Sequence, residues 1–155
     1  MTETPARSRL GAFVNLLFGY DGRIGRLYFL LGFLAFVAVI GFLSGIAEDA
    51  TAGTGDIGRY VAFVFIVGTG IWMHSAVIIK RLHDRDKAAG WYFVYGAAPF
   101  GFFILAIYFW TMRAIEIASV LFVLSFIGLI WAIVELGFLR GTSGPNRFGT
   151  KLKLR

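Results

Sequence analysis

Residues 79–87 read Ile79-Lys80-Arg81-Leu82-His83-Asp84-Arg85-Asp86-Lys87. The eight positions 80–87 carry seven ionisable side chains, and they stand between two long stretches without a formal charge, residues 60–79 and 88–112. A short charged segment between apolar stretches of that length is typical of a turn at a membrane surface. The sequence therefore predicts that the chain crosses a membrane just before and just after this turn.

The composition of the whole chain agrees with this interpretation. Of 155 residues, 58% are hydrophobic and 15% are charged, whereas soluble domains carry about 25% charged residues. Four stretches approach or exceed the length of about 20 residues that a membrane-spanning helix needs. We expect an all-α, integral membrane four-helix bundle that forms one domain over residues 1–155, because too little chain remains for a separate domain. The expected spans are about 27–47, 60–79, 88–112 and 117–138.

Two further segments flank these spans. Residues 10–18 are apolar but too short to cross a membrane, and basic residues lie near them. An interfacial helix on the membrane surface is the expected structure. Residues 140–155 begin with a glycine-rich stretch and continue with a basic end, and we expect them to form a cytoplasmic tail.

The basic residues are distributed very unevenly. Thirteen of the fifteen Lys and Arg residues precede the first span, lie in the central turn or follow the last span, and only Arg59 and Arg113 lie in the other two loops. Under the positive-inside rule, both termini and the central turn are cytoplasmic. Topology and anionic phospholipid headgroups explain the net charge of +6, so nucleic acid is not an expected partner.

Three motifs follow one another along the chain. They are Gly22-Arg23-Ile24-Gly25-Arg26, then Arg81-Leu82-His83-Asp84 with Gly90-Trp91, then the stretch from Gly141 to Gly149. Their order and spacing resemble the domain-of-unknown-function 805 family of small bacterial inner-membrane proteins, over about residues 13–150. The resemblance implies a multi-pass protein of the bacterial inner (plasma) membrane, and it implies no activity.

No arrangement of residues typical of catalysis is present. Cysteine is absent, and His74 and His83 are the only histidines, fewer than the three or four protein ligands that zinc takes. A phosphate-binding loop and a nucleophile elbow are also missing. We expect no metal, no cofactor and no enzymatic activity. The remaining enzymatic possibility is that His83 and Asp84 act as an acid–base pair on a lipid-linked substrate.

The central turn contains acidic residues, Asp84 and Asp86, although the orientation of a membrane protein depends on Lys and Arg. Arg81 lies three residues before Asp84, which places the two side chains next to each other on a helix. We expect a hydrogen-bonded cluster that ties the cytoplasmic segments together and binds either a lipid phosphate, through arginine, or a partner protein. The alternative is a solvated turn. The expected members of the cluster are Arg23, Arg26, Arg81, His83, Asp84, Asn146 and, as interfacial anchor, Trp91.

His74 and Glu135 are polar residues inside the expected spans. His74 precedes Lys80 by six residues and Glu135 precedes Arg140 by five, so the two lie at similar depth. Because an ionisable group in a membrane usually has a partner, we expect Glu135 to pair with His74, or with Arg81 or Arg26. The alternative is that Glu135 extends to the lipid headgroups and His74 forms a hydrogen bond with a backbone carbonyl. A small transporter or channel that uses both residues is the alternative function.

The first span ends with a possible contact surface between helices. Gly41 and Gly45 form a GxxxG pattern, which allows two membrane helices to approach closely. The pattern is compatible with a homodimer and with packing inside the bundle.

The orientation can be tested with reporter fusions. Fusions at Asp56 and near Ala114 are expected to report the outside of the membrane, and fusions at Lys87 and Arg155 the cytoplasm, because of the distribution of Lys and Arg. One reversed location among the four fusions would contradict the predicted topology.

Overall fold

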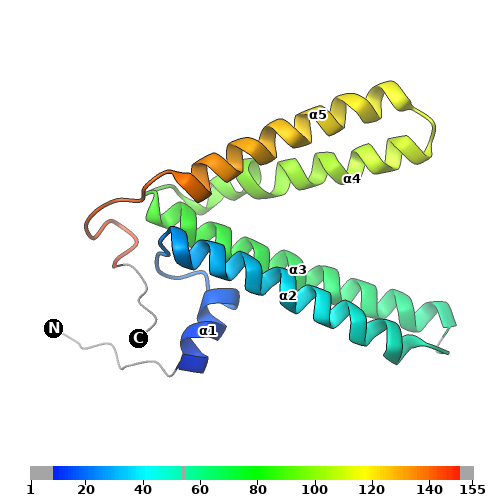
Figure 1. Cartoon of the computed structure of the whole chain (residues 1–155), viewed down its shortest axis with the longest axis horizontal. Coiled ribbons are helices and arrows are strands. Elements are labelled where there is room, and N and C mark those ends of the chain that lie inside the picture. Colours follow the sequence, from blue (N-terminus) through cyan, green and yellow to red (C-terminus); the bar gives the residue numbers. More distant parts are fainter. Residues whose placement is uncertain (1–8, 54, 151–155) are drawn as a thin grey trace.

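The structure is a computed structural model that describes residues 9–53 and 55–150 (Figure 1). The described residues form helices and contain no strand, so the predicted all-α fold class is confirmed. The 3₁₀ turn η1 and the π-helical segments η2 and η3 extend the last two α-helices at one end. In chain order the elements are α1 (Arg9–Phe18), α2 (Arg26–Thr51), α3 (Gly55–Asp84), η1 (Ala89–Trp91), η2 (Phe93–Ala97), α4 (Ala98–Thr111), α5 (Ile115–Ala132) and η3 (Ile133–Phe138).

Four helical stretches are long and apolar enough to cross a membrane. They are Arg26–Thr51, Gly55–Asp84, Ala89–Thr111 and Ile115–Phe138. Large apolar side chains such as Phe63 and Phe126 are exposed along them, as expected where lipid is the solvent. The second stretch runs five residues beyond the expected end of its span, because the charged side chains after Ile79 find partners in other parts of the chain.

The helices form two antiparallel hairpins, α2 with α3 and α4 with α5, that diverge from one common end (Figure 1). We call this end, where η1, η2 and η3 pack on α2 and α3, the closed end. In the described part of the chain, α4 and α5 themselves do not pack on α2 or α3. The bundle is therefore closed at one end only. A hydrophobic cluster joins the hairpins there and contains Ile78, Leu82, Tyr95, Ala132 and Leu136.

Helix α1 lies across the closed end of the α2/α3 hairpin (Figure 1). Leu16 and Leu17 are buried against Ile24, Met73 and Val77, which form a second hydrophobic cluster. The opposite side of α1 is apolar and exposed. Its place in the membrane interface stays a prediction, but the exposed apolar side gives α1 a surface that lipid could cover.

Small residues set the distance between α4 and α5. Pro99 lies in the first turn of α4, and its carbonyl accepts a hydrogen bond of 2.9 Å from the buried hydroxyl of Ser125. A Cβ atom at Gly128 would lie 2.9 Å from the Pro99 ring, so the close approach depends on glycine at that position.

Gly41 and Gly45 do not take part in such packing. A Cβ atom at either position would meet no other atom within 4 Å. The packing of these glycines inside the bundle is therefore not observed, and a homodimer through them stays a prediction.

Candidate functional site

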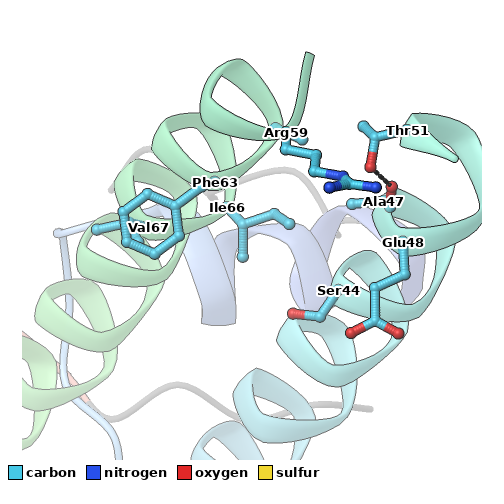
Figure 2. Close-up of a pocket in the computed structure, with 9 residues that line it drawn as sticks. Ser44, Ala47, Glu48, Thr51, Arg59, Phe63, Ile66 and Val67 are labelled. Atoms are coloured by element: carbon cyan, nitrogen blue, oxygen red, sulfur yellow. Dashed lines mark hydrogen bonds between the residues drawn. The ribbon is translucent and has the colours of Figure 1, made fainter. Parts of the chain in front are cut away.

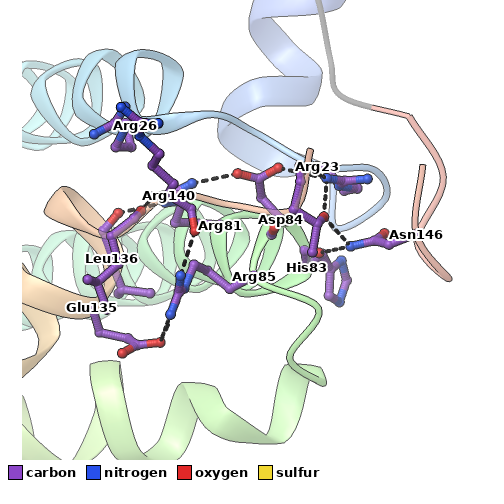
Figure 3. A network of polar contacts seen from close by, with 12 residues as sticks. Arg23, Arg26, Arg81, His83, Asp84, Arg85, Glu135, Leu136, Arg140 and Asn146 are labelled. Atoms are coloured by element: carbon purple, nitrogen blue, oxygen red, sulfur yellow. Dashed lines mark hydrogen bonds and ion pairs between the residues drawn. The ribbon is translucent and has the colours of Figure 1, made fainter. Parts of the chain in front are cut away.

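The closed end contains a carboxylate that two buried arginines share (Figure 3). Asp84, the last residue of α3, accepts a bond of 3.0 Å from Arg23 and one of 2.6 Å from Arg81. The three side chains are at most 1% exposed. We call Arg23, Arg81 and Asp84 the Asp84 cluster. Because buried charges are costly unless they are paired, the three residues depend on one another.

Arg23 connects this cluster to the segment after the last span. Its guanidinium donates to the carbonyl oxygens of Gly144 and Gly149 at 2.7 and 2.9 Å. It also donates to the hydroxyl of Thr142 at 2.5 Å and to the Thr142 carbonyl at 3.1 Å. The Nε atom of Arg23 is the one buried side-chain polar atom without a partner in the described part of the chain. The turn before α2 therefore holds the glycine-rich segment in place.

Arg81 connects the cluster to the end of η3. Its Nε atom donates to the carbonyl of Leu136 and its Nη2 atom to that of Leu139, both at 2.6 Å. The last carbonyls of a helix have no partner inside the helix and carry partial negative charge. Arg26 and Arg85 donate to two further carbonyls there, those of Phe138 and Arg140. Arginines of the α2/α3 hairpin and of the turn that follows it thus donate hydrogen bonds to the carbonyl oxygens at the end of the last span.

Lys80 donates hydrogen bonds to the carbonyl oxygens at the end of α1. Its ammonium group donates to the carbonyl oxygens of Asn15 and, at 2.7 Å, Leu16, in the last turn of α1. Lys80 is completely buried. One turn of α3 therefore binds the ends of two other helices.

The backbone of the glycine-rich segment lies directly against the end of α3. The amide of Thr142 donates to the Asp84 carbonyl at 2.8 Å, and the side chain of Asn146 donates to the His83 carbonyl, also at 2.8 Å. A Cβ atom at Gly141 would lie 1.9 Å from the Asp84 carboxylate, so this approach requires glycine.

The ring of His83 is held between two segments. It stacks on Phe148, with 3.9 Å between ring centroids and an interplanar angle of 8°. Its Nδ1 atom lies 3.3 Å from the carbonyl oxygen of Gly22. His83 therefore joins the turn before α2 to the glycine-rich segment, beside the Asp84 cluster.

A second group of charged side chains includes Glu135 of η3, which lies beside Arg85 in Figure 3. Its carboxylate lies 2.9 Å from Arg85 and 2.9 Å from Lys87. Lys87 also donates to the hydroxyl of Tyr95 at 2.9 Å and lies over the ring of Trp91. Partial burial alone would lower the pKa of Lys87, but its hydrogen bonds with Tyr95 and Glu135 outweigh that effect and raise it. We call Arg85, Lys87, Tyr95 and Glu135 the Glu135 cluster.

The predicted partners of Glu135 were wrong. Its carboxylate pairs with Arg85 and Lys87, not with His74, Arg81 or Arg26. The reason is that α3 ends at Asp84 and the chain reverses at Asp86, whose φ is +57°. This reversal brings Arg85 and Lys87 back onto η3.

His74 has separate surroundings. Its Nδ1 atom is 3.4 Å from the hydroxyl of Tyr92, and its ring lies between those of Phe36 and Tyr92. His74 and Glu135 therefore have separate partners, which differ from those of the alternative as well: Glu135 pairs with basic side chains and His74 lies beside a tyrosine hydroxyl.

The structure brings most residues of the expected cluster together. Arg26 borders the Asp84 cluster and is exposed, whereas Trp91 lies against Lys87 of the Glu135 cluster. The members found side by side are Arg23, Arg81, His83, Asp84 and Asn146.

Sequence reasoning missed Lys80, Arg85, Lys87, Thr142 and Phe148 as partners. The density of charges in residues 80–87 pointed to the first three. The partners of Arg85 and Lys87 follow from the chain reversal at Asp86. The partners of Lys80 follow from the packing of α1 on α3. Phe148 was detectable as a lone aromatic residue among glycines. Thr142 carries no comparable signal.

The geometry limits what the Asp84 cluster can do chemically. Its carboxylate is occupied by two guanidiniums, and the donors of Arg23 and Arg81 that form bonds point to groups of the same chain. Within the described residues, no three His, Cys, Asp or Glu side chains gather as they would around a metal ion. The arrangement suits the joining of chain segments better than the binding of a ligand.

The contribution of the Asp84 cluster to the free energy of unfolding can be measured by substitution. Asp84→Asn is expected to lower the free energy of unfolding by about 3 kcal/mol, because it leaves two buried guanidiniums without a negative charge. The measurement is a denaturant titration of the purified protein in mixed detergent micelles, followed by tryptophan fluorescence.

Asp86→Asn is the matched control. Asp86 pairs with Arg147 in an exposed bridge of 3.2 Å, and exposed bridges contribute about 1 kcal/mol or less. Equal stability of the two variants would refute a special role for Asp84.

Comparisons with known proteins identify relatives of the chain. The family model described as "Protein of unknown function (DUF805)" matches residues 17–150. The chain is 31% identical over 134 residues to "Uncharacterized protein YiiR" of Escherichia coli strain K12, an alignment that covers 86% of this chain and 85% of that protein. The same values hold for the protein of that name from Escherichia coli O157:H7. No solved structure matches the chain. The resemblance seen in its three motifs is thus confirmed, and the chain belongs to the DUF805 family.

Proposed function

We propose that this protein is a non-enzymatic protein of the bacterial inner membrane that binds anionic phospholipid headgroups on its cytoplasmic face. The observation that carries the proposal is a pair of exposed arginines, Arg26 and Arg140, at the closed end. Neither forms an ion pair with any described residue.

The two arginines belong to neighbouring segments. Arg26 donates to the carbonyl of Phe138 at 3.2 Å, and Arg140 follows two residues later. Both stand at the end of a membrane-spanning helix, the depth at which phosphate groups lie. A phosphate has several acceptor oxygens, each of which can accept a hydrogen bond from a guanidinium. An anionic headgroup is therefore a suitable partner.

The sequence indicates lipid binding at the cluster that contains Asp84, whereas this proposal assigns it to the exposed arginines Arg26 and Arg140. The buried arginines of that cluster already bond to carbonyl and carboxylate oxygens of the chain. The exposed guanidiniums keep donors free for a ligand. The sequence adds Lys151, Lys153 and Arg155, which lie outside the described residues, and basic residues near an anionic leaflet contribute about 1 kcal/mol each.

The surroundings of His83 and Asp84 support the non-enzymatic part of the proposal. A general acid or base must reach the proton that it transfers. The Asp84 side chain is 1% exposed and shared by two arginines, and the His83 ring is covered on one side by Phe148. The burial and pairing of Asp84 thus argue against its use as a general acid or base.

A transporter that uses His74 and Glu135 receives no support from the geometry. The two residues have separate partners, Tyr92 for the first and Arg85 with Lys87 for the second. No described contact links the two residues, so the observed contacts give no reason to favour a path between them.

The proposal predicts a loss of lipid binding in the variant Arg26→Gln/Arg140→Gln. The affinity of the purified, delipidated protein for phosphatidylglycerol is expected to fall about tenfold or more, because two cations near the headgroups contribute about 1 kcal/mol each. Native mass spectrometry during a lipid titration measures the affinity.

Arg113→Gln is the control, because Arg113 lies in the turn between α4 and α5, away from the closed end. It should leave the affinity for phosphatidylglycerol unchanged. Unchanged affinity in the Arg26/Arg140 variant would contradict the proposal. If that variant instead lost a copurifying protein, the face would be a protein-binding surface.

A further inference from the structure

A pocket of about 560 Å³ lies between α2 and α3, at the end of the hairpin away from the Asp84 cluster (Figure 2). Its volume is within the range of about 300–1,000 Å³ that is usual for small-molecule sites. The pocket is lined by Ser44, Ala47, Glu48, Thr51, Arg59, Ala62, Phe63, Ile66 and Val67.

The sequence explains why the two helices leave this space. Its lining residues recur at intervals of three and four along each helix, so they form the facing surfaces of α2 and α3. The α2 surface has the small residues Ser44 and Ala47, which leave space between the two helices. The hydroxyl of Thr51 donates to the carbonyl of Ala47 at 2.6 Å and so stays close to its own helix.

The pocket has an apolar wall and two charges. Phe63, Ile66 and Val67 supply the apolar side chains, while Glu48 and Arg59 lie nearer the end of the hairpin (Figure 2). No ion pair joins Glu48 to Arg59 or to any other described residue. The pocket therefore offers one positive and one negative group, both exposed, beside an apolar surface.

Arg59 is also unusual in its position along the chain. In the sequence, one Lys or Arg lies between the first two apolar stretches (Arg59) and one between the last two (Arg113), whereas the other thirteen lie before the first stretch, between the second and third, or after the last. A basic residue here works against the orientation that the other charges favour. Topology gives no reason for a cation at this position, but the binding of an anionic group does.

We propose that this pocket binds the headgroup of a zwitterionic phospholipid with a primary ammonium group, of the phosphatidylethanolamine type. The phosphate binds the Arg59 guanidinium, the ammonium binds the Glu48 carboxylate, and the first part of the acyl chains contacts Phe63 and Ile66. An anionic lipid such as phosphatidylglycerol would satisfy Arg59 but would leave Glu48 beside a second negative charge. Charge complementarity therefore favours the zwitterion. The site is independent of Arg26 and Arg140.

The test is a lipid titration of the delipidated full-length protein with dioleoylphosphatidylethanolamine and, separately, dioleoylphosphatidylglycerol, followed by native mass spectrometry. Arg59→Gln and Glu48→Gln are each expected to weaken phosphatidylethanolamine binding about fivefold. This loss corresponds to the upper end of the free energy that an exposed charge pair contributes. Glu48→Gln should not weaken phosphatidylglycerol binding. Both side chains are exposed, so the variants should keep the melting temperature of the parent protein.

The turn between α4 and α5 supplies matched controls, Arg113→Gln and Glu116→Gln, at the same end of the molecule but outside the pocket. They should leave phosphatidylethanolamine binding unchanged, as should Arg26→Gln/Arg140→Gln. Unchanged binding in Arg59→Gln or Glu48→Gln would overturn the proposal. So would an equal loss in the controls, or an equal loss of both lipids in Glu48→Gln.

Discussion

The carboxylate of Asp84 accepts hydrogen bonds from Arg23 and Arg81, and the rest of the closed end depends on this shared ion pair. Arg23 extends from the turn before α2 to the glycine-rich segment, and Arg81 extends from α3 to the end of η3. Each buried ion costs several kcal/mol of lost hydration, which a partner must offset. If the negative charge were removed, both guanidiniums would be left uncompensated, and the parts of the chain that they join would lose their common anchor.

The position of this cluster has a physical reason. Between membrane helices there is little hydrophobic driving force, since lipid chains are as apolar as the side chains that they replace. Two apolar hairpins need other contacts to stay together, and among the described elements they pack on each other at the closed end. Helix ends offer unpaired carbonyls there, which Lys80 and Arg81 bind. Along the rest of their length the hairpins diverge, and their surfaces are free to contact lipid.

The sequence predicted the helices and the core of the cluster for definite reasons. Long uncharged stretches mark spans, and a spacing of three residues placed Arg81 beside Asp84. Two features could not be predicted from the sequence. The divergence of the hairpins is invisible to hydropathy, because helix-facing and lipid-facing residues are both apolar. The partners of Glu135 follow from the backbone reversal at Asp86, with its positive φ, and a charged run in the sequence does not specify such a reversal.

The central claim is that the Asp84 cluster fixes the two hairpins relative to each other. Because the chain has no cysteine, spin labels can be attached at Ala52→Cys and Met112→Cys, one on each hairpin, and at Phe100→Cys and Ile117→Cys within one hairpin. Pulsed electron paramagnetic resonance in lipid nanodiscs then measures both distances. The account predicts that Asp84→Asn broadens the distribution between the hairpins and leaves the distribution within the α4/α5 hairpin unchanged. An unchanged, narrow distribution between the hairpins in Asp84→Asn would contradict it.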